Sequence, residues 1–297
     1  MNYNCLFCGN SNIKVSLKRR PVQYLILQKY YFCNYCCGFS LWPALSPDQI
    51  DKMYSTNYIG DVNVDEASLG SNDFSRFLDL KDFIKGQLLL YENVNLLDYG
   101  CGADAQVLLL SRQLGIFSTG VELNEATREK ARLTSSLSVL SPKDVILSGQ
   151  KFDVIFLGDL IEHVYDPSEL LFTLKKLLSD RGFFFIQGPL EGAKTISNFM
   201  LGIKARLKNR TPSNFPPYHV SLASLESIQK LLHRCGLEET ILTIREPLWP
   251  AKPFGSKESL STFSNFIYSA SKLCDVLISK LLKNYGTRFY CVAKVKL

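Results

Sequence analysis

The chain contains little histidine and no long apolar run. Only three of its 297 residues are histidine. The apolar runs Val154–Leu157 and Phe183–Ile186 are far shorter than the roughly 20 residues of a membrane-spanning helix. The N-terminus also lacks the basic and apolar regions of a signal peptide. These absences exclude a membrane-spanning helix, leave few candidates for a histidine base, and predict a cytoplasmic protein.

Acidic residues are absent from the first 45 positions, and the net charge of +6 is uneven along the chain. Residues 93–193 hold 9 basic and 13 acidic side chains, whereas residues 194–297 hold 16 basic and 6 acidic ones. The basic third favours contact with phosphate, an acidic glycan or an anionic membrane, although a solvated surface explains it equally well. Its basic residues lack the interleaved aromatics of a base-stacking platform, which disfavours nucleic acid as a partner.

Nine cysteines occur in this chain, and an odd number without an export signal argues against a disulfide framework. Cys5 and Cys8 form one pair with two residues between them, and Cys33 and Cys36 form another. Two such thiolate pairs predict a tetrahedral, structural Zn²⁺ site of the ribbon type. A metal-free thiol cluster, an iron–sulfur cluster and Cys37 as a replacement ligand stay open as alternatives.

The stretch from Val94 to Asp104 is the most informative part of the chain. An apolar run ends at Asp98, and Gly100 and Gly102 follow in what we expect to be a tight turn after a buried strand. A second apolar run ends at Glu122, about 20 residues later, where an acid can bind ribose hydroxyls. The pattern predicts a nucleotide-like ligand. Because Asp98 and Asp104 would repel a pyrophosphate, it favours a ligand with a sulfonium and an α-ammonium group.

Strands and helices alternate from Leu96 onward, which predicts a parallel, doubly wound sheet. We expect strands at 94–98, 118–122, 138–140, 152–157, 182–187, 238–244 and 287–294. Helices are expected at about 104–114, 124–135, 168–179 and 222–235. The division that follows is a zinc-ribbon module at 1–45, a helical linker and lead-in helix at 46–92, and a main domain at 93–297. The main domain carries insertions at 192–221 and 246–285. The second insertion contains an amphipathic helix, for which we expect packing on the core, a lid, or a partner or membrane contact.

Three motifs together resemble class I S-adenosylmethionine-dependent methyltransferases. They are Leu96-Leu-Asp-Tyr-Gly-Cys-Gly, Gly120-Val-Glu-Leu-Asn, and the segment from Phe152 through Glu162-His163 to Pro167. The resemblance implies a Rossmann-like, doubly wound, seven-stranded and mostly parallel sheet, here with a small N-terminal zinc ribbon. It also implies that S-adenosylmethionine binds to residues at the ends of the first, second and fourth strands. We assign this role to Asp98, Tyr99, Gly100, Gly102, Glu122, Leu123, Asp159 and Leu160.

Methyl transfer to a hydroxyl requires a general base as well as alignment of the reactants. His219 follows the fifth strand of the main domain and is our candidate base, with Glu162 and His163 as further candidates; each can instead have a purely structural role. Tyr218 is a candidate for orienting the acceptor. The ribbon resembles modules of methyltransferases that modify sugars, glycans or secondary metabolites, which implies a small-molecule, sugar or glycan acceptor. The alternatives are a zinc-ribbon protein that binds or modifies nucleic acid, a non-catalytic scaffold and a dehydrogenase.

Overall fold

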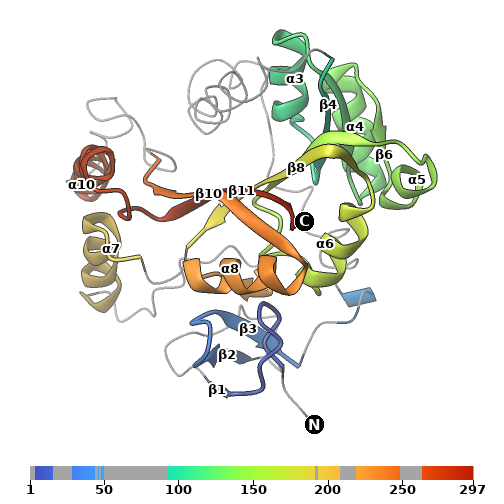
Figure 1. Ribbon diagram of the computed structural model, residues 1–297. Coiled ribbons are helices and arrows are strands. Elements are labelled where there is room, and N and C mark those ends of the chain that lie inside the picture. The colour runs from blue at the N-terminus through green and yellow to red at the C-terminus, as the bar shows by residue number, and fades with distance from the viewer. Residues whose placement is uncertain are drawn as a thin grey trace.

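A computed structural model describes residues 4–15, 29–43, 46, 48–49, 93–190, 193–207, 219–247 and 263–296 of the chain. The predicted linker and lead-in helix at 46–92 lie almost entirely outside these residues, as do Tyr218 and part of each insertion. The described chain forms a large domain around a seven-stranded sheet and a smaller sheet below it (Figure 1).

The central sheet has the strand order β10-β11-β8-β7-β4-β5-β6. β8, β7, β4, β5 and β6 are mutually parallel, and β11 pairs antiparallel with both β8 and β10. The seven strands are β4 (Asn95–Tyr99), β5 (Phe117–Val121), β6 (Val139–Leu140), β7 (Phe152–Gly158), β8 (Leu178–Pro189), β10 (Leu237–Arg245) and β11 (Arg288–Val295). The sequence-based prediction of a seven-stranded, mostly parallel and doubly wound sheet is confirmed.

Alternate residues of the central strands pack into two different layers of the core. Leu96 and Val154 contribute to the layer that contains Val107 of α3, and Leu97 and Ile155 to the layer that contains helices α6 and α8. Both layers are buried because a parallel sheet is covered by helices on its two faces. The helices of this domain are α3 (Gln106–Gln113), α4 (Glu125–Ser135), α5 (Pro142–Leu147), α6 (Pro167–Lys175) and α8 (Leu225–Arg234).

Local sequence signals explain where two of these helices begin and end. The Asp166 side chain accepts from the backbone N–H groups of Ser168 and Glu169, with Pro167 in the first turn, as the sequence predicts for the start of α6. α8 ends before Gly236, whose φ of +66° suits glycine. α3 has Ala105 as its N-cap, and no side chain caps this helix.

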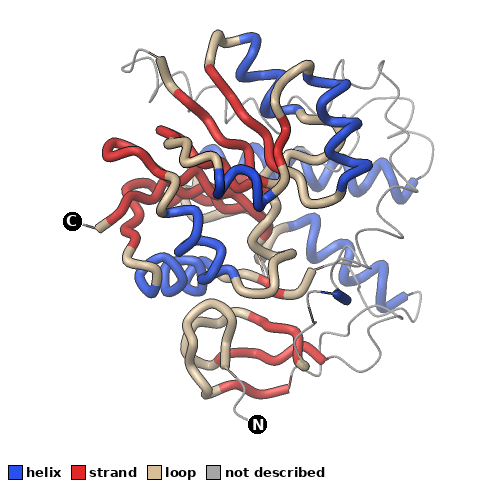
Figure 2. Tube along the Cα trace, turned by 90° about the vertical axis from the view of Figure 1, so that its right-hand side faces the viewer, coloured by secondary structure: helices blue, strands red, loops and turns tan. Residues whose placement is uncertain are grey.

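The smaller sheet has the order β1-β2-β3-β9 and is antiparallel throughout. Its strands are β1 (Ile13–Val15), β2 (Lys29–Cys33), β3 (Phe39–Trp42) and β9 (Ser221–Leu222). Three strands come from the N-terminal module and the fourth comes from the main domain, directly before α8. The module therefore lies against α8, as Figures 1 and 2 show from two sides.

Two further helices, α7 (Ile196–Leu207) and α10 (Phe263–Leu281), pack against each other at the β10 edge of the central sheet (Figure 1). Each belongs to one of the two predicted insertions. No helix among the described residues is both long enough and apolar enough to cross a membrane.

Candidate active site and metal centre

The glycine turn lies at the carboxyl end of β4. Gly100 has a φ of +87° and Gly102 a φ of +65°, which side chains rarely adopt. A Cβ atom on Gly100 would also lie 3.0 Å from Cδ1 of Leu160, in the loop that follows β7. The backbone N–H groups of Gly100 and Cys101 donate to the carbonyl of Val121 on β5 (2.8 and 3.0 Å). The turn therefore needs glycine both for its conformation and for the close approach of Leu160.

Three carboxylates surround this turn. Asp98 is the last residue but one of β4 and is 3% exposed. Burial, followed by the charges of Asp104 and Glu122, raises the pKa of Asp98 well above its ordinary value. Burial also raises the pKa of Glu122, although its carboxylate accepts from the backbone N–H groups of Gly102 (3.2 Å) and Asn124 (3.0 Å).

This cluster of one buried and two half-buried carboxylates repels anions and is stabilised by a cation. A ligand bearing a positive sulfur and an ammonium group fits this charge, whereas a pyrophosphate does not. Glu122 is held by backbone groups at the end of β5, where a ribose would lie in such a fold. The charge and the donors of this site thus fit S-adenosylmethionine, for which Asp98 and Glu122 stay the predicted contacts.

The loop after β7 contributes two other residues that we assign to the cofactor. Asp159 has a φ of +52°, and its side chain forms an ion pair with Arg288, which is 5% exposed. This carboxylate therefore already has a partner within the protein, and no local sequence motif marks Arg288 as that partner. Leu160 contacts the glycine turn, as described above. Leu123 is 53% exposed beside Glu122, and Tyr99 is half-buried.

The candidate catalytic side chains lie together. Oε1 of Glu162 is 3.9 Å from Nε2 of His219 and 4.0 Å from Nε2 of His163. The two imidazole rings are in edge contact, with centroids 4.7 Å apart and an interplanar angle of 76°. His219 is far from the other two in sequence, so only the fold brings the three together. His233 is exposed on α8 and takes no part.

His219 is buried, and its Nδ1 atom has no hydrogen-bond partner. Burial and the neighbouring His163 lower the pKa of His219 to about 3, against the opposing charge of Asp159. The imidazole is therefore neutral near pH 7 and has a lone pair available to accept a proton. Glu162, which is 4% exposed, lies 3.9 Å from Nε2 of His219, where an ionised carboxylate would favour a protonated imidazole.

The ligating atoms of Glu162, His163 and His219 lie within 4.8 Å of one another, so a metal ion is an alternative occupant. Nitrogen and oxygen ligands at about 2.1 Å from one ion are roughly 3.0–3.4 Å apart. The separations of 3.9 and 4.0 Å are wider, which favours an acid–base cluster over a metal centre.

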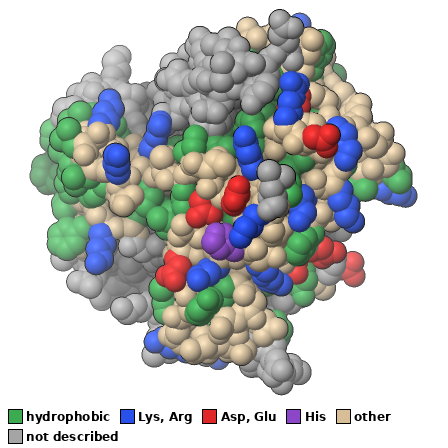
Figure 3. Space-filling view, in the orientation of Figure 1, with side chains coloured by type: hydrophobic (Ala, Val, Ile, Leu, Met, Phe, Trp, Pro, Cys, Tyr) green, Lys and Arg blue, Asp and Glu red, His purple; other side chains and the backbone are tan. Residues whose placement is uncertain are grey.

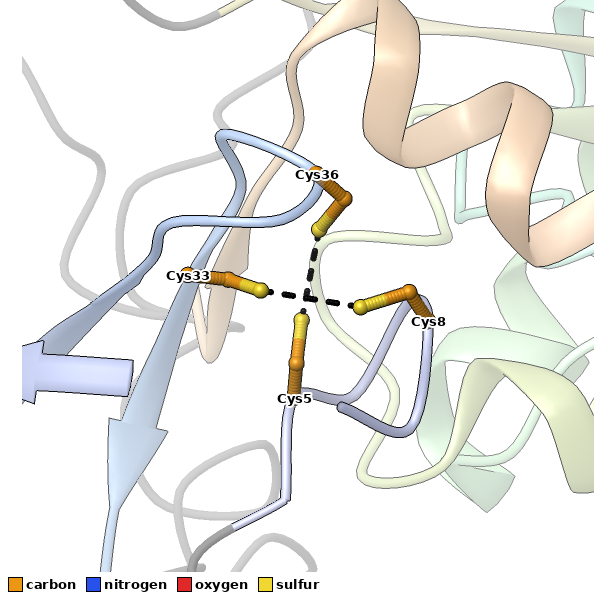
Figure 4. Close-up of side chains that lie close together, drawn as sticks. All are labelled: Cys5, Cys8, Cys33 and Cys36. Carbon is orange, nitrogen blue, oxygen red and sulfur yellow. Dashed lines mark hydrogen bonds between the residues drawn. The ribbon is translucent and has the colours of Figure 1, made fainter. Parts of the chain in front are cut away.

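The four predicted zinc ligands meet at one point, each pointing toward the others (Figure 4). The Sγ atoms of Cys5 and Cys36 are 3.5 Å apart, and those of Cys8 and Cys33 are 3.6 Å apart. A tetrahedral Zn²⁺ with Zn–S bonds of about 2.3 Å separates its sulfurs by about 3.8 Å. The four thiols therefore fit a structural Zn²⁺ with only small adjustments.

The two cysteine loops have matching backbone geometry. The N–H of Gly9 donates to the carbonyl of Cys5, and the N–H of Cys37 donates to the carbonyl of Cys33, each at 2.9 Å. Gly9 and Cys37 both have positive φ values, of 72° and 57°. Cys37 occupies the glycine position of its loop and is exposed, so it is not a member of the thiol cluster.

Comparison with known proteins identifies the family. A family model described as "Methyltransferase domain" matches residues 71–241, more than half of the chain. The chain belongs to this family. The resemblance to S-adenosylmethionine-dependent methyltransferases is therefore confirmed for this domain. The zinc ribbon is supported only by the cluster of four cysteines.

The curated relatives include two proteins named ubiquinone biosynthesis O-methyltransferase. That of Bartonella quintana is 30% identical over 106 residues, covering 33% of this chain and 42% of the relative. That of Pelagibacter ubique is 32% identical over 118 residues, covering 36% of this chain and 47% of the relative. The matches thus span about half the length of these relatives.

Among solved structures, the [4+2]-cyclase SpnF aligns with a TM-score of 0.54 at 14% identity. The alignment covers 86% of this chain and 98% of the cyclase. This likeness concerns the fold, and it shows that the fold also occurs in a protein named for a different reaction.

Proposed function

We propose that the protein transfers a methyl group from S-adenosylmethionine to a hydroxyl of a small-molecule acceptor, with His219 as the general base. Bound at the glycine turn, the cofactor supplies an activated methyl group and its sulfur as the leaving group. The protein's part is to align the acceptor, exclude water and remove the hydroxyl proton.

One observation carries this proposal: the short loop after β7 touches both halves of the site. Leu160 in this loop packs against Gly100 of the cofactor turn, and Glu162, two residues later, lies beside His219. The proposed acid–base group is thus adjacent in the chain to a residue that contacts the proposed cofactor site.

The acceptor class draws on two kinds of support. The relatives are named as O-methyltransferases of ubiquinone biosynthesis, which favours a hydroxyl acceptor of low molecular weight. The zinc ribbon favours a sugar or glycan through the resemblance given above. We propose that the acceptor is a hydroxylated small molecule, with sugars and phenols as the two groups to screen first. A cytoplasmic location stays a prediction.

The test measures transfer of a labelled methyl group to panels of sugars and phenols. The matched variants are His219→Gln and His233→Gln, because His233 is an exposed histidine outside the site. We expect a loss of roughly 100-fold or more in kcat for His219→Gln and wild-type rates for His233→Gln. Cofactor binding without transfer to any acceptor would favour a non-catalytic scaffold, and equal activity of both variants would exclude His219 as the base.

A further inference from the structure

α10 has an exposed apolar stripe along its length. Phe263 is 79% exposed, Leu277 54% and Leu281 83%, and Phe266 at 37% lies on the same side. Taken in chain order, these four residues are separated by 3, 11 and 4 positions, which places them on one face of a helix. α7 continues this surface, because Phe199 is 68% exposed and Ile203 37%. Figure 3 shows hydrophobic side chains gathered on the side of the molecule where the two helices lie. We call these six residues the apolar face.

The opposite side of α10 is polar and buried. Ser271, Lys272 and Asp275 are each less than 9% exposed. Lys272 forms an ion pair with Glu246 at the end of β10. Asp275 accepts from the backbone N–H groups at the start of α7, at 2.9 Å for Ile196 and 2.8 Å for Ser197. A surface helix usually buries its apolar side and exposes its polar side to water, and α10 has the opposite arrangement.

The structure shows which side of this helix faces inward. Its exposed apolar residues face outward, and its polar side anchors it to Glu246 and to the start of α7. These contacts fix the orientation of the helix, because turning it would separate Lys272 and Asp275 from their partners and leave Glu246 buried and unpaired. An apolar surface held outward in this way is typical of an interaction site.

The charged side chains near the apolar face indicate whether it binds a second copy of the chain or a lipid surface. Among the described side chains of 193–207 and 263–283, the exposed charged residues are Lys194, Lys280 and Lys283, and the acid Asp275 is buried. In a symmetric contact between two copies, the same patch meets itself and these lysines would repel each other. An anionic lipid surface, in contrast, offers an apolar layer under a negative one.

We propose that the apolar face docks on the surface of an anionic membrane. The aromatic and leucine side chains enter the acyl–headgroup boundary, and the lysines contact lipid phosphates. The association that we propose is peripheral, since these side chains reach only the acyl–headgroup boundary. This proposal goes beyond the methyl-transfer function and does not depend on it.

The experiment is flotation of the full chain with vesicles of phosphatidylcholine and phosphatidylglycerol, or of phosphatidylcholine alone. We expect binding to the anionic vesicles that weakens with salt. The double variant Phe263→Ser/Leu281→Ser and the variant Lys280→Glu/Lys283→Glu should each bind roughly tenfold more weakly. The control is Phe117→Ser, since Phe117 is 67% exposed on β5, away from this face.

Three results would overturn the proposal. One is absence of binding to anionic vesicles, and another is equal binding by the Phe263→Ser/Leu281→Ser and Phe117→Ser variants. The third is self-association, measured by sedimentation, that the double variant abolishes, because that would assign the face to a second copy of the chain. Thermal unfolding of each variant shows whether its fold is intact.

A second inference comes from the contact between the zinc module and the candidate base. The backbone N–H of Leu41 on β3 donates to the carbonyl of Val220 (2.8 Å), and Ser40 pairs with Ser221 of β9. The hydroxyl of Tyr30 on β2, which is 3% exposed, donates to the carbonyl of His219 itself (2.5 Å). The sheet of the metal module therefore continues into the segment that begins with the candidate base.

The same segment is held from its other side by the candidate site. The N–H groups of Val220 and Ser221 both donate to the carbonyl of Glu162, at 2.8 and 3.2 Å. Next to it, the hydroxyl of Ser224 donates to the carbonyl of Cys36, a zinc ligand in our assignment (2.6 Å). His219 is thus fixed between the loop after β7 and the module.

We propose that the metal-loaded module positions His219, with Tyr30 as the positioning residue. This inference rests on the proposed function for its catalytic meaning. Its structural content is independent: loss of the Tyr30 hydroxyl or of the metal changes the surroundings of the His219 ring while the glycine turn, on the other side of the loop, keeps its cofactor affinity.

The test uses nuclear magnetic resonance of labelled histidine rings, since the chain has three histidines and His233 is an exposed internal control. Tyr30→Phe is compared with Tyr31→Phe, which changes the next residue of the same strand. We expect the His219 signal to shift, and its titration to move toward the ordinary value, in Tyr30→Phe and in metal-stripped protein only. Zinc content and S-adenosylmethionine affinity of Tyr30→Phe should equal those of wild type.

Wild-type His219 signals in both Tyr30→Phe and metal-stripped protein would refute the positioning role. A shifted His219 signal without any change in kcat would uphold the contact but count against His219 as the base. The two failures are therefore distinguishable.

Discussion

Replacing Asp98 by asparagine tests the charge of the cofactor site. Asp98 is buried at the end of β4, and burial together with Asp104 and Glu122 raises its pKa. A hydrogen bond between charged groups contributes about 1.5–3 kcal/mol, and charges about 4 Å apart interact by up to about 4 kcal/mol at an effective dielectric of 20. We expect Asp98→Asn to weaken S-adenosylmethionine binding by about 2 kcal/mol, or roughly 30-fold in Kd.

The same substitution has the opposite effect on the free protein. A carboxyl with a raised folded-state pKa stabilises the fold below its unfolded pKa, and this contribution is lost as the pH rises through the folded value. Asp98→Asn replaces the carboxyl by a group that does not titrate, so the variant does not lose this stability as the pH rises. The cofactor-free variant should therefore unfold at a higher temperature than wild type at neutral pH, with a smaller decrease in stability as the pH rises.

Calorimetric titration and thermal unfolding measure the two effects, with Asp180→Asn, an exposed aspartate on β8, as the control. Methylthioadenosine, which lacks the amino-acid part of the cofactor, is the control ligand, and its affinity should change little. Equal losses for both ligands, or a variant that binds normally and is no more stable, would refute our account of Asp98.

Further predictions concern the ribose, the metal and an ion pair. Glu122→Ala should weaken S-adenosylmethionine binding by roughly 1–3 kcal/mol by loss of ribose hydrogen bonds, and unchanged affinity in a titration would contradict this role. Replacing both Cys33 and Cys36 by serine should release zinc, measured by elemental analysis, and unfold the N-terminal module. The control variant Cys37→Ser, which changes an exposed neighbouring cysteine, should keep the metal. Asp153→Asn should lower the unfolding temperature at neutral pH. The pKa of Asp153 is lowered: burial raises it, but the hydrogen bond from Arg181 (2.8 Å) and other contacts outweigh burial. The carboxylate therefore stabilises the fold above its unfolded-state pKa, and this stabilisation is lost as the pH falls through the folded-state pKa. An unchanged unfolding temperature would show that this pair contributes nothing.

The central sheet and the glycine turn could be predicted from sequence because their signals are local. Apolar runs mark the strands, and Gly100 and Gly102 mark a turn that needs positive φ values. The two cysteine pairs are equally local, since each loop closes within a few residues. Spacing alone therefore indicated four ligands, and the fold only had to bring the two loops together.

Other features depend on tertiary contacts that a local pattern does not contain. The periodicity of 263–281 predicts a helix with an apolar stripe, but it cannot say that Lys272 and Asp275 find partners inside and turn the stripe outward. β9 has two residues, too few for a strand signal, and it pairs with β3, which lies more than 180 positions earlier in the chain. The ion pair of Asp159 with Arg288 likewise joins distant segments.

The positive charge of the cofactor is tested most directly by a calorimetric titration of the purified full chain with S-adenosylmethionine and, in parallel, with a nicotinamide dinucleotide. We expect saturable binding of the sulfonium compound, weakened by Asp98→Asn, and no binding of the dinucleotide. Binding of the dinucleotide alone, or of neither compound, would contradict this expectation.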